Sequence, residues 1–375
     1  MTKTFPLIIS FIFSGFITFS QNGISISALR FIGEKIIDHN APFKGTTIGG
    51  LSGIDYNSDE KIFYLLSDDR SVINPARFYT AKIDFSSTNI NSIDFLEVYT
   101  LHQKNGMPYP SIKTDPALTP DPESIRYNAK TKQLFWSSEG ERMLREKGNV
   151  LADPSITIAT KEGNLISSFL LPEHLKILAT EKGPRQNGTL EGITFSTDFN
   201  LLYAALEEPL YEDGPRAEVE ATKSLVRIYK FDLTGKKNNA QYAYPLESVA
   251  YPPLVSGLFI VNGISEIVFI GQNKLLTVER SFSTGRLPCT IKIFITDLTN
   301  ADNVMKIKSL KESTAKMVEK KLLLNMDDLG IYIDNIEGVT FGPELPNGHK
   351  TLIFVSDNNF LSIEKTQFLL FEVIP

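Results

Sequence analysis

The stretch "GTLEGITFSTDFNLLYAALEEPL", residues 188–210, contains the pattern that decides the fold of this chain. Glu191 stands between small residues and is followed by an apolar alternation, a polar turn, a second apolar run and the acidic pair Glu207 and Glu208. Two short apolar runs joined by a polar turn are typical of a β-hairpin. The stretch therefore predicts a hairpin that carries acidic residues at one end.

The same pattern recurs four more times along the chain. The other copies are "GGLSGIDYNSDEKIFYLLSDDR" (49–70), "PDPESIRYNAKTKQLFWSSEGER" (120–142), "GISEIVFIGQNKLLTVERSF" (263–282) and "NIEGVTFGPELPNGHKTLIFVSDNNF" (335–360). The motif starts are spaced by 71, 68, 74 and 72 residues, and they are Ser52, Glu123, Glu191, Ser265 and Glu337. Hairpins at a fixed long period indicate radial or solenoidal repetition.

We therefore predict an all-β fold, a single β-propeller of five or six blades. Propeller blades are typically about 40–50 residues long, so the longer period implies long insertions between strands. Two stacked β-sandwiches are the alternative, but they would not explain a shared period. The early segment 24–37 and the last segment 367–375 are both strand-like, and we expect them to share one blade and close the ring. The best helical candidate is 305–326, although its first half fits a strand equally well.

The N-terminus has the pattern of a secretory signal peptide over residues 1–20. Lys3 precedes a short apolar run, small residues follow, and we expect cleavage before Gln21. An uncleaved membrane anchor is the weaker alternative, because the run is short and holds a proline and a glycine. Residues 21–375 are then one domain of a secreted or periplasmic protein with no stable membrane insertion, and we expect a monomer.

Composition excludes several classes of function. The net charge of −6 argues against nucleic acid as a partner. The four histidines contain no metal-spaced pair, which argues against zinc, and no G-x-S-x-G elbow supports a serine esterase. Cys289 is the single cysteine, and its place at the start of an apolar strand predicts a buried structural thiol.

The repeated acids predict a shared site. If each stretch is the hairpin of one blade, equivalent residues face one rim of the central channel, and both ends of each hairpin contribute there. The predicted metal ligands are Glu123, Glu191, Glu266 and Glu337 at the strand starts, with Asp68, Asp69, Glu139, Glu207 and Asp357 at the returning ends. Crowded carboxylates repel one another unless cations neutralise them, and oxygen ligands suit hard cations, Ca²⁺ first. The alternative is that these acids are solvated surface charge.

Three arginines stand beside these acids. An arginine offers a planar fork that suits phosphate or carboxylate. We expect Arg70 and Arg280 to contact a ligand, whereas Arg126 fits ligand contact and a structural ion pair equally well.

At the level of motifs the chain resembles the phytase-like domain family, also called esterase-like activity of phytase. The motifs that carry the resemblance run in order from Gly49 to Asn359 and are "GGLSGI…LLSDDR", "DPESI…WSSEGE", "EGITF…ALEEPL", "SEIVF…LTVERSF" and "NIEGVTFG…VSDNNF". The resemblance implies an exported bacterial β-propeller and hydrolysis of a phosphate ester or ester. The Asp-Asp-Pro-Ala signature of alkaline β-propeller phytases is present only as the fragments "DPAL" and "DPES", which weakens the case for phytate as substrate.

The leading functional hypothesis is therefore a calcium-dependent phosphoesterase that acts on a small molecule. Its catalytic residues would be Glu191 and Glu337, which hold calcium, with Arg70 and Arg280 on the phosphate. One alternative is a calcium hydrolase of the sugar-lactonase type that uses Glu337, Asp357 and Asn358. The other is a non-catalytic binding propeller, since the fold alone implies no chemistry.

Overall fold

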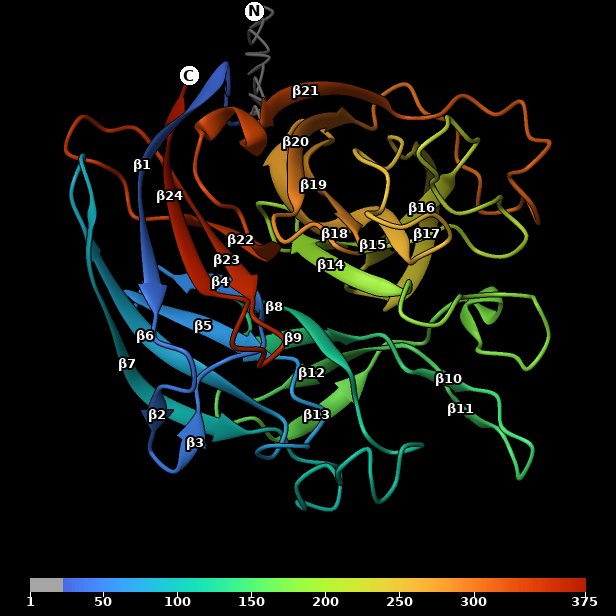
Figure 1. The fold of residues 1–375 in the computed structure, drawn as a ribbon, viewed down its shortest axis with the longest axis horizontal. Coiled ribbons are helices and arrows are strands. Elements are labelled where there is room, and N and C mark those ends of the chain that lie inside the picture. The colour runs from blue at the N-terminus through green and yellow to red at the C-terminus, as the bar shows by residue number, and fades with distance from the viewer. Residues whose placement is uncertain (1–22) are drawn as a thin grey trace, which may run out of the picture.

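The computed structural model describes residues 23–375, and its strands form five four-stranded antiparallel sheets around a central channel. The prediction of a single all-β propeller is confirmed, and the number of blades is five (Figure 1). The predicted signal peptide lies outside the described residues. Within the described part of the chain, no helix has the length and apolar character needed to span a bilayer.

Each blade is an antiparallel sheet whose first strand faces the channel and contacts the first strands of its neighbours. Blade 1 contains β4 (Leu51–Asn57), β5 (Ile62–Ser67), β6 (Arg77–Phe85) and β7 (Ile90–Thr100). Blade 2 contains β8 (Pro122–Asn128), β9 (Gln133–Ser138), β12 (Ser155–Ala159) and β13 (Leu165–Ser168). Blade 3 contains β14 (Leu190–Phe195), β15 (Leu201–Leu206), β16 (Leu225–Asp232) and β17 (Lys237–Pro245).

Blade 4 contains β18 (Ile260–Gly271), β19 (Lys274–Ser283), β20 (Thr290–Asp297) and β21 (Glu319–Asn325). Blade 5 contains β22 (Asn335–Gly342), β23 (Thr351–Asp357), β24 (Thr366–Ile374) and β1 (Ala28–Ile37). The blade is completed from both ends of the chain, because β1 pairs with β24 from Ala28 opposite Ile374 to Ile37 opposite Thr366. The expected closure of the ring by the two terminal segments is therefore confirmed, and Figure 1 shows the blue strand β1 beside the red strand β24.

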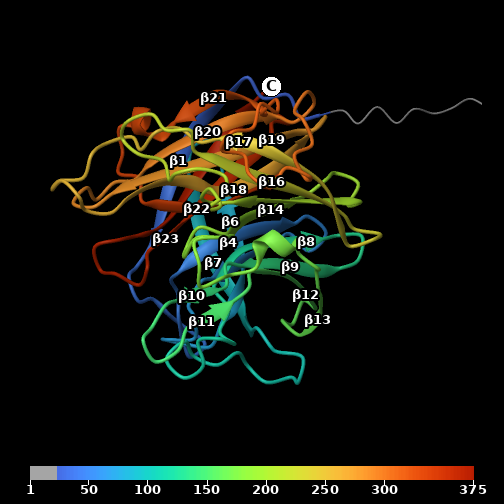
Figure 2. The same ribbon diagram turned by 90° about the vertical axis from the view of Figure 1, so that its right-hand side faces the viewer.

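Short elements occupy the insertions between strands. They are the hairpins β2 (Pro42–Phe43) with β3 (Thr46–Thr47) and β10 (Glu141–Met143) with β11 (Val150–Ala152), and the 3-10 turns η1 (Glu173–Leu175) and η2 (Met326–Leu329). Figure 2 shows the long loops that project beyond the strands of the sheets.

The prediction of a helix over residues 305–326 is wrong. Its second half is β21, and the chain before it is irregular and packs on the outer strand of blade 3. The Val304 amide donates to the carbonyl of Gln241 at 2.8 Å, and the Val318 amide donates to the carbonyl of Ala243 at 3.0 Å. The segment satisfies its backbone against β17, and this tertiary pairing overrides the local helix propensity.

A β-bulge occurs at the motif start of every blade. The registers of the five inner hairpins shift at these positions, which are Ser52, Glu123, Glu191, Ser265 and Glu337. A bulge bends its strand and re-aims a side chain. The common period in the sequence therefore reflects one repeated backbone feature at the end of the channel.

The residue after the motif start lies where neighbouring blades approach most closely. It is Gly53, Ser124, Gly192 and Gly338 in four of the blades. A Cβ atom at Gly53 would lie 2.8 Å from the amide nitrogen of Ile125, and one at Gly192 would lie 2.6 Å from that of Ile267. Four of the five blades have a small residue here because the inner strands converge.

Blade 4 places Glu266 at this constricted position, and its carboxylate closes the channel. It accepts a hydrogen bond from Ser124 Oγ and pairs with Arg126, each at 2.8 Å. Arg126 also donates to the carbonyls of Ile54, Ile267 and Val339, which belong to three other blades. Because Glu266 is one residue past the bulge, it does not join the acids at the mouth where it was expected, and Arg126 is a structural ion-pair partner.

We predict that the Arg126–Glu266 pair is essential to the stability of the ring. Removing one member of a buried pair leaves an uncompensated charge, so Arg126→Met should lower the free energy of unfolding by about 3–5 kcal/mol. Chemical denaturation would measure this loss. The matched control is Lys161→Met, which breaks the exposed pair of Lys161 with Glu60 and should cost at most about 1 kcal/mol. Equal losses of the free energy of unfolding in the two variants would contradict a stabilising role for the Arg126–Glu266 pair.

Candidate functional site

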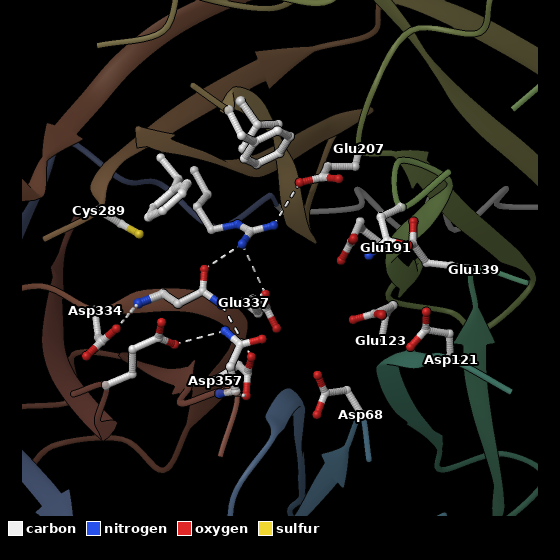
Figure 3. Close-up of a pocket in the computed structure, with 18 of the residues that line it drawn as sticks. Asp68, Asp121, Glu123, Glu139, Glu191, Glu207, Cys289, Asp334, Glu337 and Asp357 are labelled. Carbon is white, nitrogen blue, oxygen red and sulfur yellow. Dashed lines mark hydrogen bonds and ion pairs between the residues drawn. The ribbon is translucent and has the colours of Figure 1, made fainter. Parts of the chain in front are cut away.

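A pocket of about 310 Å³ opens at the bulged end of the channel. Its described lining contains one basic side chain, Arg280, and the ten carboxyl groups of Asp68, Asp121, Glu123, Glu139, Glu191, Glu207, Asp334, Glu337, Asp357 and Glu364. Figure 3 shows how the labelled carboxyl groups converge from several blades on one space. The Arg126–Glu266 pair lies deeper in the channel and is not part of this lining.

Two structural positions supply most of these acids. Glu123, Glu191 and Glu337 occupy the bulges of the inner strands β8, β14 and β22. The second strand of each antiparallel hairpin returns to the same end, and in blades 1, 2, 3 and 5 its last or next residue is acidic. These returning residues are Asp68, Glu139, Glu207 and Asp357 after or at the ends of β5, β9, β15 and β23. The predicted convergence of both ends of the hairpin therefore holds for seven of the expected ligands.

Glu123 and Glu191 are buried carboxylates of the pocket that lack a compensating partner in the described part of the chain. Their side chains are 9% and 5% exposed, and among residues 23–375 neither has a hydrogen bond or ion pair to its carboxylate. Burial raises the pKa of both groups well above the usual range, and neighbouring carboxylates raise it further. The pKa of Asp68 is raised well above its usual range for the same reasons.

Two groups of carboxylates have the spacing needed to hold a metal ion. Asp121, Glu123 and Glu139 form one group, and Glu139, Glu191 and Glu207 form the other, each with one oxygen per residue within 4.8 Å of the others. Glu139 belongs to both groups. A donor set of carboxylate oxygens suits a hard divalent cation.

The opposite side of the pocket is organised by Arg280. Its guanidinium pairs with Glu207 at 2.7 Å and with Glu337 at 3.2 Å, and it also donates to the side-chain carbonyl of Asn335. The Asn335 amide donates to Glu337 at 2.9 Å. Burial raises the pKa of Glu337 to about 8 despite the nearby arginine, and that of Asp357 to about 7.

Several expected residues have structural partners instead of lining the pocket. Asp69 accepts from Arg77 at 2.8 Å and from the amides of the following loop. Arg70 pairs with Glu141 at 2.5 Å and with Asp121 at 3.3 Å, so it contacts the site through a carboxylate that already lines it.

Two further residues named from the sequence, Asn358 and Cys289, also have structural roles. Asn358 accepts from the Gly50 amide at 3.0 Å and does not line the pocket. Cys289 is buried, and burial raises the pKa of its thiol to about 12, which fits the expected inert cysteine.

Sequence reasoning missed six acidic or amide residues of the pocket, two of which are Asn187 and Asn359. Asp121 stands two residues before Glu123 in "DPES", Asp334 stands directly before the last motif, and Asn335 is the first residue of that motif, so adjacency to the bulge was an available signal. Glu364 has no counterpart in the other repeats. It reaches the pocket from the loop between β23 and β24, and no sequence pattern indicates this.

Comparison with known proteins gives one family. The family described as "Phytase-like: Esterase-like activity of phytase" matches residues 46–360. A search of curated proteins found no match.

Three solved structures with similar chains are distant from this one in sequence. An endo-arabinase from Bacteroides thetaiotaomicron has 11% identity over 88% of this chain and 95% of its own, with a TM-score of 0.43. A periplasmic gluconolactonase from Pseudomonas aeruginosa has 10% identity over 88% and 87%, with a TM-score of 0.37. A putative 6-phosphogluconolactonase from Bacteroides uniformis has 12% identity over 83% and 79%, with a TM-score of 0.36. Similarity this distant carries no argument about function.

We predict that the metal-free protein loses stability as the pH rises from about 5 to about 8. Burial raises the pKa of Asp121 to about 6, of Asp357 to about 7 and of Glu337 to about 8. The corresponding pKa values in the unfolded chain are about 4, so the folded chain binds more protons over this interval and its free energy of unfolding falls with pH. Melting temperatures in chelator at several pH values would test this.

A matched pair of variants identifies which carboxyl group causes the fall in melting temperature with pH. Glu337→Gln should flatten it, whereas Glu344→Gln, on an exposed side chain, should leave it unchanged. A melting temperature that rises with pH across this interval would contradict the prediction.

Proposed function

The chain belongs to the phytase-like family, and from this membership we propose that it is an exported, calcium-dependent hydrolase of phosphate esters. Export rests on the leader-like pattern of residues 1–20. The pocket at the bulged end of the channel is the proposed active site, and a small-molecule phosphate ester is the proposed substrate.

The observation that carries the proposal is the pair of buried carboxylates without a protein partner, Glu123 and Glu191, on either side of Glu139. An ionised carboxylate in such a place is costly unless a cation faces it. The donor set fits calcium, which takes several carboxylate oxygens in a flexible geometry. Asp121, Glu123, Glu139, Glu191 and Glu207 would hold the metal, and calcium there would supply positive charge for the phosphoryl oxygens.

Arg280 is the proposed anchor for the phosphoryl group. It is the one basic side chain in the described lining, and its fork is fixed in place by Glu207, Glu337 and Asn335. A fixed guanidinium provides directed donors at little cost of reorganisation. Arg70 would act indirectly, because its ion pair with Asp121 orients that carboxylate.

Glu337 is the proposed proton-transfer group on this side of the pocket. It lies beside Arg280 and accepts from Asn335, and burial raises its pKa to about 8. A carboxyl group that changes protonation near neutral pH can accept or donate a proton during hydrolysis. Glu191 would act on the opposite side as a ligand of the cation.

We predict that calcium stabilises the folded protein. A ligand that binds only the native state adds stability by mass action, about 2.7 kcal/mol at a concentration one hundred times its dissociation constant. The melting temperature should therefore rise with added calcium and fall with chelator. Glu123→Gln should weaken this response, with Glu344→Gln as the matched surface control. A melting temperature that is the same in chelator and in millimolar calcium would contradict a calcium site.

We also predict that Glu191→Gln and Glu337→Gln each lower phosphate-ester hydrolysis at least about a hundredfold with the fold retained. Glu→Gln preserves shape while it removes the charge or the transferable proton, and loss of a general acid–base group typically costs about 10²–10⁴ in rate. Calcium-dependent turnover of phosphate esters and of lactones would be assayed, with circular dichroism to confirm folding.

The substrate panel separates the proposed enzyme from its alternatives. Lactone turnover with no phosphate-ester turnover would favour a lactonase-type hydrolase. Wild-type protein that turns over neither class in calcium would leave a binding propeller. Activity that simply follows the amount of folded protein in the two variants would make these glutamates structural.

A further inference from the structure

The inner hairpin of blade 4 is extended at the pocket end. Strand β18 has 12 residues, whereas the inner strands of the other blades have 6 to 8. Five of its residues, 260–264, precede the bulge at Ser265, and they pair with the last residues of β19. Blade 4 therefore continues past the level of the acids and forms a wall above the pocket floor.

One face of this wall looks into the pocket. Gly263 is opposite Arg280, and the next pair on the same face is Val261 with Phe282, because side chains in a strand alternate between faces. A Cβ atom at Gly263 would lie 2.4 Å from Cγ of Glu207, so this face meets the acidic site directly. The surface that rises from the single arginine is therefore apolar.

Two further apolar side chains complete the wall. Phe259 and Leu287 line the same pocket, and they are 53% and 57% exposed. The Phe259 and Phe282 rings pack with centroids 6.3 Å apart. The Thr284 amide donates to the carbonyl of Phe259 at 3.0 Å, and this bond ties the two loops together. The wall is thus held in place by backbone hydrogen bonds, while the side chains of Phe259 and Leu287 remain open to a ligand.

The charges of the pocket limit how many phosphate groups a ligand bound against this wall can carry. A substrate with many phosphate groups needs many cationic contacts, since each charge must be compensated. The described lining has one arginine and ten carboxyl groups, and the proposed calcium would face only one group of phosphoryl oxygens. A ligand with one phosphoryl group and an apolar remainder matches both parts of the pocket.

We propose that the substrates are esters of a single phosphoryl group with an apolar alcohol, whose alkyl or aryl part packs against Phe259, Val261, Phe282 and Leu287. This assignment rests on the proposed function, because it places the phosphoryl group between Arg280 and the acidic groups. The same balance of charge, one arginine against ten carboxyl groups, excludes inositol hexakisphosphate as the substrate.

The test uses binding so that it does not depend on turnover. Isothermal titration of the full protein with methyl-, butyl- and hexylphosphonate in calcium would give three dissociation constants. Burying a methylene is worth up to about a fourfold change in affinity, so hexylphosphonate should bind at least about tenfold more tightly than methylphosphonate. The double variant Phe259→Ser, Leu287→Ser should reduce this ratio several-fold. Leu170→Ser, on a side chain that is 86% exposed and outside the pocket lining, is the matched control and should preserve the ratio.

The outcomes separate this inference from the proposed hydrolase. Phosphonates that bind without dependence on chain length would overturn the inference, even if phosphate esters are hydrolysed. Chain-length dependence that is lost in the double variant would support the apolar wall as the surface that binds the alkyl or aryl part, even if no ester is turned over and the proposed hydrolase fails. Absence of phosphonate binding, or displacement of hexylphosphonate by equimolar inositol hexakisphosphate, would overturn it.

Discussion

The convergence of five inner strands on one narrow channel is the constraint on which the rest of the structure depends. At the tightest level the backbones of neighbouring blades approach so closely that Gly53, Gly192 and Gly338 leave no room for a Cβ atom. The bulge just before this level absorbs an extra residue in each blade. A bulged residue cannot continue the regular pleat, so its side chain is delivered to the mouth of the channel.

Closure of the channel converts that mouth into a pocket with unusual electrostatics. The Arg126–Glu266 pair fills the centre and bonds to carbonyls of several blades, so the acids above it are shielded from one side. Burial then favours the protonated form of each carboxyl group, and mutual repulsion adds to this effect. Such a site takes up either protons or cations, and this competition connects its pH response with its proposed affinity for calcium.

The five repeats are equivalent in backbone and unequal in chemistry. Blades 2, 3 and 5 place glutamates at the bulge, whereas blades 1 and 4 place Ser52 and Ser265 there. Blade 4 instead contributes Arg280 and the apolar face that follows it. The ring is therefore divided into an acidic side that suits a cation and a mixed side that suits an anion attached to an apolar group. The two sides of the pocket differ in chemistry because the repeats differ in their residues, although they share one backbone.

The sequence by itself determined the propeller, the ring closure and the convergence of acids such as Glu123, Glu191 and Glu337, because these follow from period, alternation and hairpin geometry. Tertiary structure decided which acids remain free. Asp69 and Arg70 have the same sequence signals as true lining residues, but Arg77 pairs with Asp69 and Glu141 pairs with Arg70. Arg77 comes from strand β6 of the same blade, and Glu141 comes from the repeat of blade 2. Glu266 stands one residue after the motif start Ser265, and the bulge at Ser265 turns this offset into a position deeper in the channel. A one-residue change of phase reverses the direction of a strand side chain, and its effect on the site depends on where the bulge lies. The partner of a charge is set by packing between distant segments, so it cannot be read from the order of residues in the sequence.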